Sequence, residues 1–180
     1  MLAELFNKHG TDKESVHHYA AIYEWLLADR RMEPLRILEV GVASGASLRA
    51  WEEYFPNAEI VGVDKNPKAK LAVVSRSKIV IGDATQLATL RDLGLFDVVI
   101  DDGSHLPRDQ SAVFSLLWPR TRIVYILEDV GVGGGRNRFN ILGWLNERFR
   151  HKIDSWRTPA PPMCWTIIAK ELVAFRRITQ

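Results

Sequence analysis

The amino-acid sequence predicts an α/β fold: a doubly wound, mostly parallel sheet with helices on both faces and an antiparallel hairpin at its C-terminal end. Short runs of apolar, β-branched residues bounded by turn residues are typical of buried parallel strands. These runs alternate with segments of helical periodicity, and this alternation favours right-handed crossovers between parallel strands. Two further strand-like runs, separated by Lys170 and Glu171, indicate the terminal hairpin.

Strands are expected where apolar runs stop at turn residues, and helices where apolar residues recur every three or four positions. The predicted strands span residues 35–40, 60–63, 78–81, 96–100, 122–127, 163–169 and 172–178. The predicted helices span residues 15–29, 46–54, a short segment from about 86, 108–117 and 139–149, and residues 1–14 are expected to be irregular. We expect a single domain over residues 1–180, with residues 1–34 as an N-terminal helical extension or lid and 35–180 as the sheet core.

The composition is that of an ordinary globular protein, with 180 residues, 47% of them hydrophobic and 26% charged, and a net charge of +2. The basic residues are scattered, which argues against a nucleic-acid partner; the cluster at 148–152 is a solvated helix end or, alternatively, a nucleic-acid footprint. No apolar run reaches membrane-spanning length and the N-terminus lacks a basic signal-peptide start, so we expect a cytoplasmic protein without a membrane partner. The single Cys164 excludes internal disulfides and fits a reducing compartment. We also expect a homo-oligomer, such as a dimer.

Two acidic segments follow neighbouring predicted strands. Asp101 and Asp102 come after the run at 96–100, and Glu128 and Asp129 come after the run at 122–127. Open α/β sheets bind ligands at the carboxyl ends of their strands. Four carboxylates gathered there would repel one another unless a cation offset them, and a hard divalent ion such as Mg²⁺ is the simplest answer.

His105 lies three residues after Asp102, close enough to act as a base beside such an ion. The alternative for His105 is a loop residue that caps the helix beginning near Pro107. For Asp101 and Glu128 the alternative is a strand-end carboxylate that accepts hydrogen bonds from backbone amides.

The glycines at 41 and 45 frame a turn from strand to helix, where a ligand can approach the backbone closely. The dinucleotide-binding fingerprint requires a middle glycine, but this chain has Ala43 at that position. Glu39, just before the turn, would disfavour a pyrophosphate. The turn therefore suits a ligand with a cationic or zwitterionic head better than NAD.

Two carboxylates end the next strands. Asp64 can accept both hydroxyls of a ribose, and Asp83 lies where an adenine amino group could bind. A ribose and an adenine without a pyrophosphate indicate S-adenosylmethionine. The alternatives are a turn that serves helix–strand packing alone and strand-end acids that cap helices.

Several segments together carry a family resemblance: 9–13 (HGTDK), 39–45 (EVGVASG), 51–56 (WEEYFP), 100–105 (IDDGSH) and 127–130 (LEDV). Over residues 7–130 the chain resembles the class I S-adenosylmethionine-dependent methyltransferases, which have a Rossmann-like sheet. It is most similar to the metal-dependent sugar O-methyltransferases, which include the macrolide sugar and the mycobacterial methylmannose polysaccharide O-methyltransferases.

The resemblance implies S-adenosylmethionine-dependent, Mg²⁺-assisted O-methylation of a hydroxyl on a sugar, an oligosaccharide or a glycosylated small molecule. It implies that Asp102 and Asp129 bind the metal and that His105 is the general base, and Glu128 is a further candidate ligand. The candidate residues for binding the methyl donor are Thr11, Lys13, Glu39, Gly41, Ser44, Ser47, Asp64, Asp83 and Asp101. The loop at 131–135 is expected to be an acceptor-site flap or, alternatively, a plain linker.

Other functions share parts of this pattern. A methyltransferase of another small-molecule hydroxyl or of a nucleic acid would use the same donor site. A non-catalytic adenosylmethionine-binding module would need neither the acid clusters nor His105. A nicotinamide-dependent oxidoreductase would use the same fold, but the missing middle glycine argues against it. His17 and His18 are expected to be neighbours on one helix, which would prevent them from sharing a face.

Overall fold

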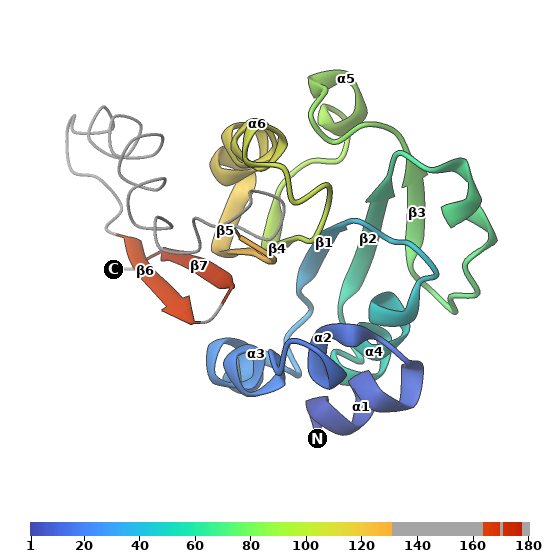
Figure 1. Ribbon diagram of the computed structural model, residues 1–180, viewed down its shortest axis with the longest axis vertical. Helices are drawn as coiled ribbons and strands as arrows, with labels where there is room; N and C mark the ends of the chain where they lie inside the picture. The colour runs from blue at the N-terminus through green and yellow to red at the C-terminus, as the bar shows by residue number, and fades with distance from the viewer. Residues whose placement is uncertain (131–163, 170, 178–180) are drawn as a thin grey trace.

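The computed structural model describes residues 1–130, 164–169 and 171–177, which form one seven-stranded sheet with surrounding helices (Figure 1). The strands are β1 (Arg36–Val40), β2 (Glu59–Asp64), β3 (Lys78–Ile81), β4 (Phe96–Asp101), β5 (Thr121–Leu127), β6 (Cys164–Ala169) and β7 (Leu172–Arg177). The α-helices are α1 (Leu2–His9), α2 (Asp12–Ser15), α3 (Ala20–Leu27), α4 (Ala46–Tyr54), α5 (Leu87–Leu90) and α6 (Pro107–Leu117). Short 3₁₀ turns lie at Ala28–Arg30, Pro67–Leu71 and Trp118–Arg120.

The strand order is β3-β2-β1-β4-β5-β7-β6, and every pair up to β5 is parallel. Strand β7 pairs antiparallel with both β5 and β6, so the predicted terminal hairpin is confirmed. The order of the strands reverses between β1 and β4. Because ligands of doubly wound sheets bind at the carboxyl ends beside such a reversal, the ends of β1 and β4 mark the expected site.

Helices cover both faces of the sheet, with α1, α3 and α4 on one side and α5 and α6 on the other (Figure 1). On the first side, the rings of Phe6 and Tyr23 pack against Trp51 above apolar residues of the central strands. On the second side, Phe114 stacks on Trp118 against the other face of the sheet. Each large side chain buried in this way contributes about 1.5–3 kcal/mol, which holds the strand ends in place.

The N-terminal segment differs from the prediction. Residues 1–14 are not irregular, because they form α1 and α2, and the single helix expected over 15–29 is replaced by the shorter α3. The backbone turns at His18, whose φ of 56° lies in the left-handed region. Val16, which would lie on the apolar face of a helix over 15–29, is 64% exposed. Burial of Phe6 in the core, rather than local periodicity, determines this segment.

The other predicted elements within the described residues agree with the structure to within one residue at their ends. The predicted helix at 139–149, the glycine-rich loop at 131–135 and the basic cluster at 148–152 lie outside the described residues. None of the helices in the described part of the chain is long and apolar enough to cross a bilayer.

The backbone after β1 passes very close to the backbone after β4. Gly41 has a φ of 93°, and a Cβ atom added to it would lie 2.0 Å from the carbonyl oxygen of Asp102. Backbone hydrogen bonds fix this approach from both sides, from Gly41 N to the Val63 carbonyl and from Asp102 N to the Val40 carbonyl, each 2.9 Å long. The need for glycine here therefore comes from the chain itself as well as from any ligand.

We expect Gly41→Ala to lower the free energy of unfolding by more than about 2 kcal/mol, because it adds a backbone clash to the strain of a left-handed alanine. Gly10→Ala is the matched control, since Gly10 has a φ of 73° with no heavy atom within 4 Å of the added Cβ. The control should cost only about 1 kcal/mol. Urea unfolding measures both, and equal losses would show that the contact with Asp102 does not fix Gly41.

Candidate active site

A single lysine ammonium lies among the carboxylates at the ends of three strands. Lys13, from α2, is 1% exposed. Its Nζ lies 2.6 Å from Asp102 Oδ2, 2.7 Å from Glu128 Oε2 and 3.4 Å from Glu39 Oε1. Burial alone lowers the pKa of Lys13, but the three carboxylates raise it well above its ordinary value, so the ammonium stays charged. Three negative charges and one positive charge leave this cluster with a net charge of −2 when all are ionised.

Glu39 and Glu128 are enclosed at the edge of the sheet. Glu128 is 2% exposed, and its second carboxylate oxygen accepts a hydrogen bond from the hydroxyl of Tyr23. Burial raises the pKa of Glu128 in spite of the nearby ammonium. Glu39 is fully buried, and it accepts a hydrogen bond of 2.8 Å from the hydroxyl of Ser47. These two predicted donor-binding residues, Glu39 and Ser47, thus contact each other inside the protein.

Asp102, His105 and Asp129 converge at the same edge of the sheet. Each offers one ligand atom, and these atoms lie within 4.8 Å of one another. His105 Nε2 is 3.8 Å from Asp129 Oδ2. His105 and Asp129 have φ values of 56° and 52°, a left-handed conformation that non-glycine residues seldom adopt and that clusters at functional sites. The structure therefore brings together the predicted base and two predicted metal ligands, whereas Glu128 lies outside this group.

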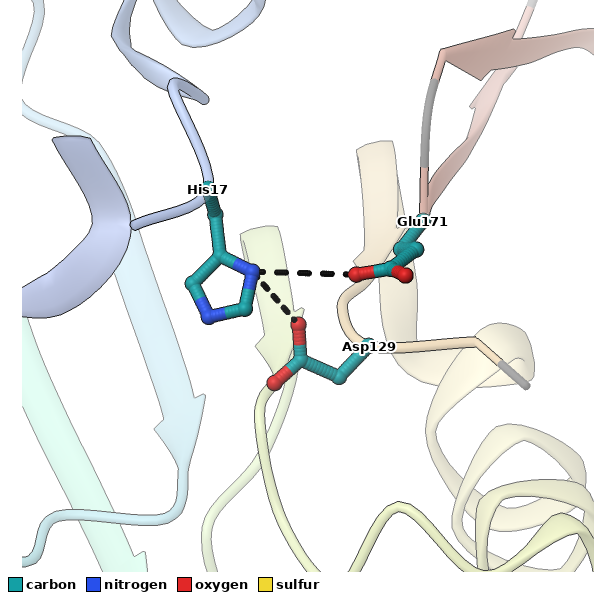
Figure 2. A group of neighbouring side chains, drawn as sticks. All are labelled: His17, Asp129 and Glu171. Carbon is teal, nitrogen blue, oxygen red and sulfur yellow. Dashed lines mark ion pairs between the residues drawn. The ribbon is translucent and has the colours of Figure 1, made fainter. Parts of the chain in front are cut away.

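Asp129 also faces the N-terminal segment and the hairpin. Its Oδ1 accepts a hydrogen bond of 3.0 Å from the hydroxyl of Tyr19 and lies 3.4 Å from Nδ1 of His17. Figure 2 shows that the carboxylates of Asp129 and Glu171 both lie on one side of the His17 ring, facing its Nδ1. Glu171 precedes β7, so the antiparallel hairpin brings its turn to the carboxyl ends of the parallel strands.

A pocket with a cavity volume of about 120 Å³ opens beside this group, at the carboxyl ends of the parallel strands. Four of the predicted donor-binding residues line it: Gly41, Asp64, Asp83 and Asp101. Burial raises the pKa of Asp101 to about 7, although Asp101 also accepts a hydrogen bond of 2.7 Å from the Tyr125 hydroxyl. Asp101 thus lines the pocket and directly precedes Asp102, a member of the group with His105 and Asp129.

The carboxylates of Asp64 and Asp83 both organise loops. Asp64 accepts hydrogen bonds from the backbone N–H groups of Val42, Ala43 and Asn66. Partial burial raises the pKa of Asp64, but these three donors bring it below its ordinary value. Asp83 accepts hydrogen bonds from the backbone N–H and the hydroxyl of Thr85. Both acids therefore hold the pocket's rim in shape as well as facing into it.

The other five predicted donor-binding residues do not line the pocket: Glu39 and Ser47, described above, and Thr11, Lys13 and Ser44. Thr11 caps α2 by accepting a hydrogen bond of 3.4 Å from the backbone N–H of Lys13. Lys13 itself contacts the carboxylates, and the side chain of Ser44 is exposed on the turn after β1.

Sequence reasoning missed the tyrosines and left His17 unresolved. Tyr19 and Tyr23 fall at helical spacing within the helix expected over 15–29, and both are buried, but their hydroxyls reach Asp129 and Glu128. His17 was expected to share a helix with His18, whereas both lie in the connection between α2 and α3. No local signal could have found these contacts, because their partners are more than 100 positions away in the sequence.

No family model matches the chain, but curated proteins do. The 8-demethyl-8-alpha-L-rhamnosyl tetracenomycin-C 2'-O-methyltransferase of Streptomyces olivaceus is 38% identical over 142 residues, which cover 72% of this chain and 37% of that protein. The demethylmacrocin O-methyltransferase of Streptomyces fradiae is 34% identical over 188 residues, which cover 88% of this chain and 47% of that protein.

Among solved structures, the MycE methyltransferase from the mycinamycin biosynthetic pathway, in complex with Mg, SAH and mycinamycin VI, matches with a TM-score of 0.80 and 27% identity. The match covers 98% of this chain and 53% of MycE. This chain is a homologue of sugar O-methyltransferases. This chain has the class I methyltransferase fold, as the sequence motifs predicted. It spans about half or less of the length of these relatives.

The substitution Lys13→Met would leave the carboxylates of Glu39, Asp102 and Glu128 without the ammonium that lies among them. We expect a loss of about 3–5 kcal/mol in the free energy of unfolding at neutral pH. The loss should shrink as the pH falls, because the carboxylates then take up protons and lose their charge. Urea unfolding across a pH series measures both effects.

Lys8→Met is the matched control, because Lys8 pairs with Glu53 at the surface and its side chain is 59% exposed. Removing such an exposed pair costs about 1 kcal/mol or less. If the two variants were equally stable at neutral pH, the ammonium of Lys13 would not be what stabilises the acidic cluster.

Proposed function

We propose that this chain transfers the methyl group of S-adenosylmethionine to a hydroxyl on the sugar of a glycosylated small molecule, assisted by Mg²⁺ or another divalent cation. The observation that carries the proposal is the convergence of Asp102, His105 and Asp129 beside a strand-end pocket, in a homologue of sugar O-methyltransferases. MycE, which matches 98% of the chain, is described in complex with Mg and SAH.

The pocket at the ends of β1 to β4 is the proposed donor site. Gly41 lines it, and Asp64 and Asp83 place carboxylates on its rim that can accept hydrogen bonds from ribose hydroxyls and an adenine amino group. The negative charge of these rim carboxylates suits the positive sulfonium better than it suits a pyrophosphate. This charge favours S-adenosylmethionine over NAD as the ligand.

The residues at the sheet edge fit a hard divalent cation. Asp102 and Asp129 each supply a carboxylate oxygen, and the adjacent cluster around Lys13 carries excess negative charge that a cation offsets. A divalent ion held there lowers the pKa of an alcohol that binds it. Glu128, with both oxygens hydrogen-bonded to Lys13 and Tyr23, orients Lys13 in our proposal.

His105 is the proposed general base. Its side chain is 34% exposed, so an acceptor hydroxyl can reach it, and its Nε2 faces Asp129. Its Nδ1 is buried, with no hydrogen-bond partner among the described residues. Taking the acceptor's proton at the moment of methyl transfer requires this placement beside the ion rather than on it.

The proposed acceptor is a deoxysugar attached to a larger natural product. The name of one relative includes a rhamnosyl tetracenomycin, and the solved structure of MycE is a complex with mycinamycin VI. The chain covers 37% and 53% of those two proteins, so acceptor recognition is a proposal for the homologous region alone.

We expect methyl transfer from labelled S-adenosylmethionine to a rhamnosylated acceptor to stop when the divalent cation is chelated and to return when Mg²⁺ is added. Asp102→Ala and Asp129→Ala should each resemble the chelated protein but still bind S-adenosylhomocysteine in calorimetry. Asp92→Ala, which removes an acid that is 83% exposed, is the control and should keep its activity. Full activity in excess chelator would contradict the role of the metal.

We expect His105→Ala to reduce turnover by about 10²–10⁴-fold, the usual contribution of a positioned base. Affinity for donor and for Mg²⁺ should remain, and the pH–rate profile should lose one limb. His18→Ala is the control, because His18 is 61% exposed and faces Glu14 instead. Loss of Mg²⁺ binding in His105→Ala would make His105 a ligand, and unchanged turnover would show that another group takes the proton.

A further inference from the structure

Asp129 takes part in a second group of ligand atoms. His17, Asp129 and Glu171 each offer one such atom, and the three atoms lie within 4.8 Å of one another. Figure 2 shows the imidazole of His17 directed at both carboxylates. The three side chains are 17%, 13% and 31% exposed, so a small ion can enter while most bulk water is excluded.

A single hydrogen bond from His17 does not explain why both carboxylates lie near the same ring nitrogen. The same ring nitrogen of His17, Nδ1, lies 3.4 Å from Asp129 Oδ1 and 3.8 Å from Glu171 Oε2. One N–H group can donate one good hydrogen bond, and 3.8 Å is beyond hydrogen-bond range. A nitrogen lone pair and two carboxylate oxygens around one point are instead the ligands of a divalent cation.

Neighbouring side chains also fix the position of the His17 ring. The other ring nitrogen, Nε2, lies 3.9 Å from Asp12 Oδ2, which is beyond hydrogen-bond range. The ring stacks on Tyr19, with centroids 5.1 Å apart and planes 22° from parallel. Tyr19 also donates its hydroxyl to Asp129 Oδ1 at 3.0 Å, so it orients two of the three ligands.

We propose that His17, Asp129 and Glu171 form a second divalent-cation site, which prefers a transition-metal ion such as Mn²⁺ to Mg²⁺. A first-row transition-metal ion accepts an imidazole nitrogen beside two carboxylate oxygens more readily than Mg²⁺ does, because Mg²⁺ prefers oxygen ligands throughout. Asp129 bridges the two sites, because Oδ1 faces His17 while Oδ2 faces His105. The second site stands on its own contacts and does not require that the chain transfer methyl groups.

An ion at this position would join three separate segments of the chain. His17 comes from the connection after α2, Asp129 follows β5, and Glu171 precedes β7. A backbone hydrogen bond of 2.9 Å from Val130 N to the Glu171 carbonyl already ties the last two together. The ion would add the N-terminal segment to them, and it would raise the protein's stability in proportion to the logarithm of its concentration above Kd.

The test counts bound Mn²⁺ by electron paramagnetic resonance, with neither donor nor acceptor present. The wild-type chain should bind two equivalents, and His17→Gln should bind one. His18→Gln is the matched control, since His18 faces Glu14 and is 61% exposed, and it should still bind two. If His17→Gln binds as many ions as the wild type with unchanged affinity, the second site is overturned.

Two further variants separate this result from a folding defect and from the proposed function. Glu171→Gln alters a different segment and should weaken the binding of the same Mn²⁺ ion at least tenfold. Asp102→Asn should still bind that Mn²⁺ ion when a tenfold excess of Mg²⁺ is added. Thermal unfolding without metal should show each variant folded. If Asp102→Asn bound no Mn²⁺, the wild-type protein would have a single cation site that includes Asp102, and the proposal would be overturned. Failure of methyl transfer would not change the Mn²⁺ count, so the two proposals fail separately.

Discussion

The ammonium of Lys13 ties the N-terminal segment to the carboxyl ends of β1, β4 and β5 through Glu39, Asp102 and Glu128. Bringing carboxylates together at one sheet edge is costly, and burying them is costlier, unless a cation compensates. A lysine supplied by a distant segment meets that requirement within the chain itself. It leaves Asp102 at the boundary, partly exposed, where its carboxylate faces both the protein's own cation and the group formed with His105 and Asp129.

The sheet was predictable because both of its faces are buried. A strand covered on both sides needs apolar residues at successive positions, and such runs stand out at 36–40, 96–101 and 121–127. The acids that end these runs were predictable for the same reason, since the end of a buried strand is where polar residues return. The positions of Asp102 and Asp129 at neighbouring strand ends follow directly from that pattern.

The N-terminal region was not predictable from local pattern. Lysine is seldom fully buried, so nothing marked Lys13 as an interior residue, and the apolar spacing of residues 16–27 suited one continuous helix. The actual break lets Tyr19 and Tyr23 direct their hydroxyls at carboxylates that follow β5. Such pairings depend on where the sheet places its ends, and they exist only once the whole fold has formed.

The close approach of Gly41 to the carbonyl of Asp102 has a mechanical consequence. The turn that borders the proposed donor pocket and Asp102, a member of the proposed ion-binding group, are in backbone contact, with no side chain between them to absorb a displacement. A shift of either segment upon binding is therefore transmitted to the other. By thermodynamic linkage the effect runs equally in both directions, so occupancy of one half of the site and affinity in the other half are coupled by the same free energy.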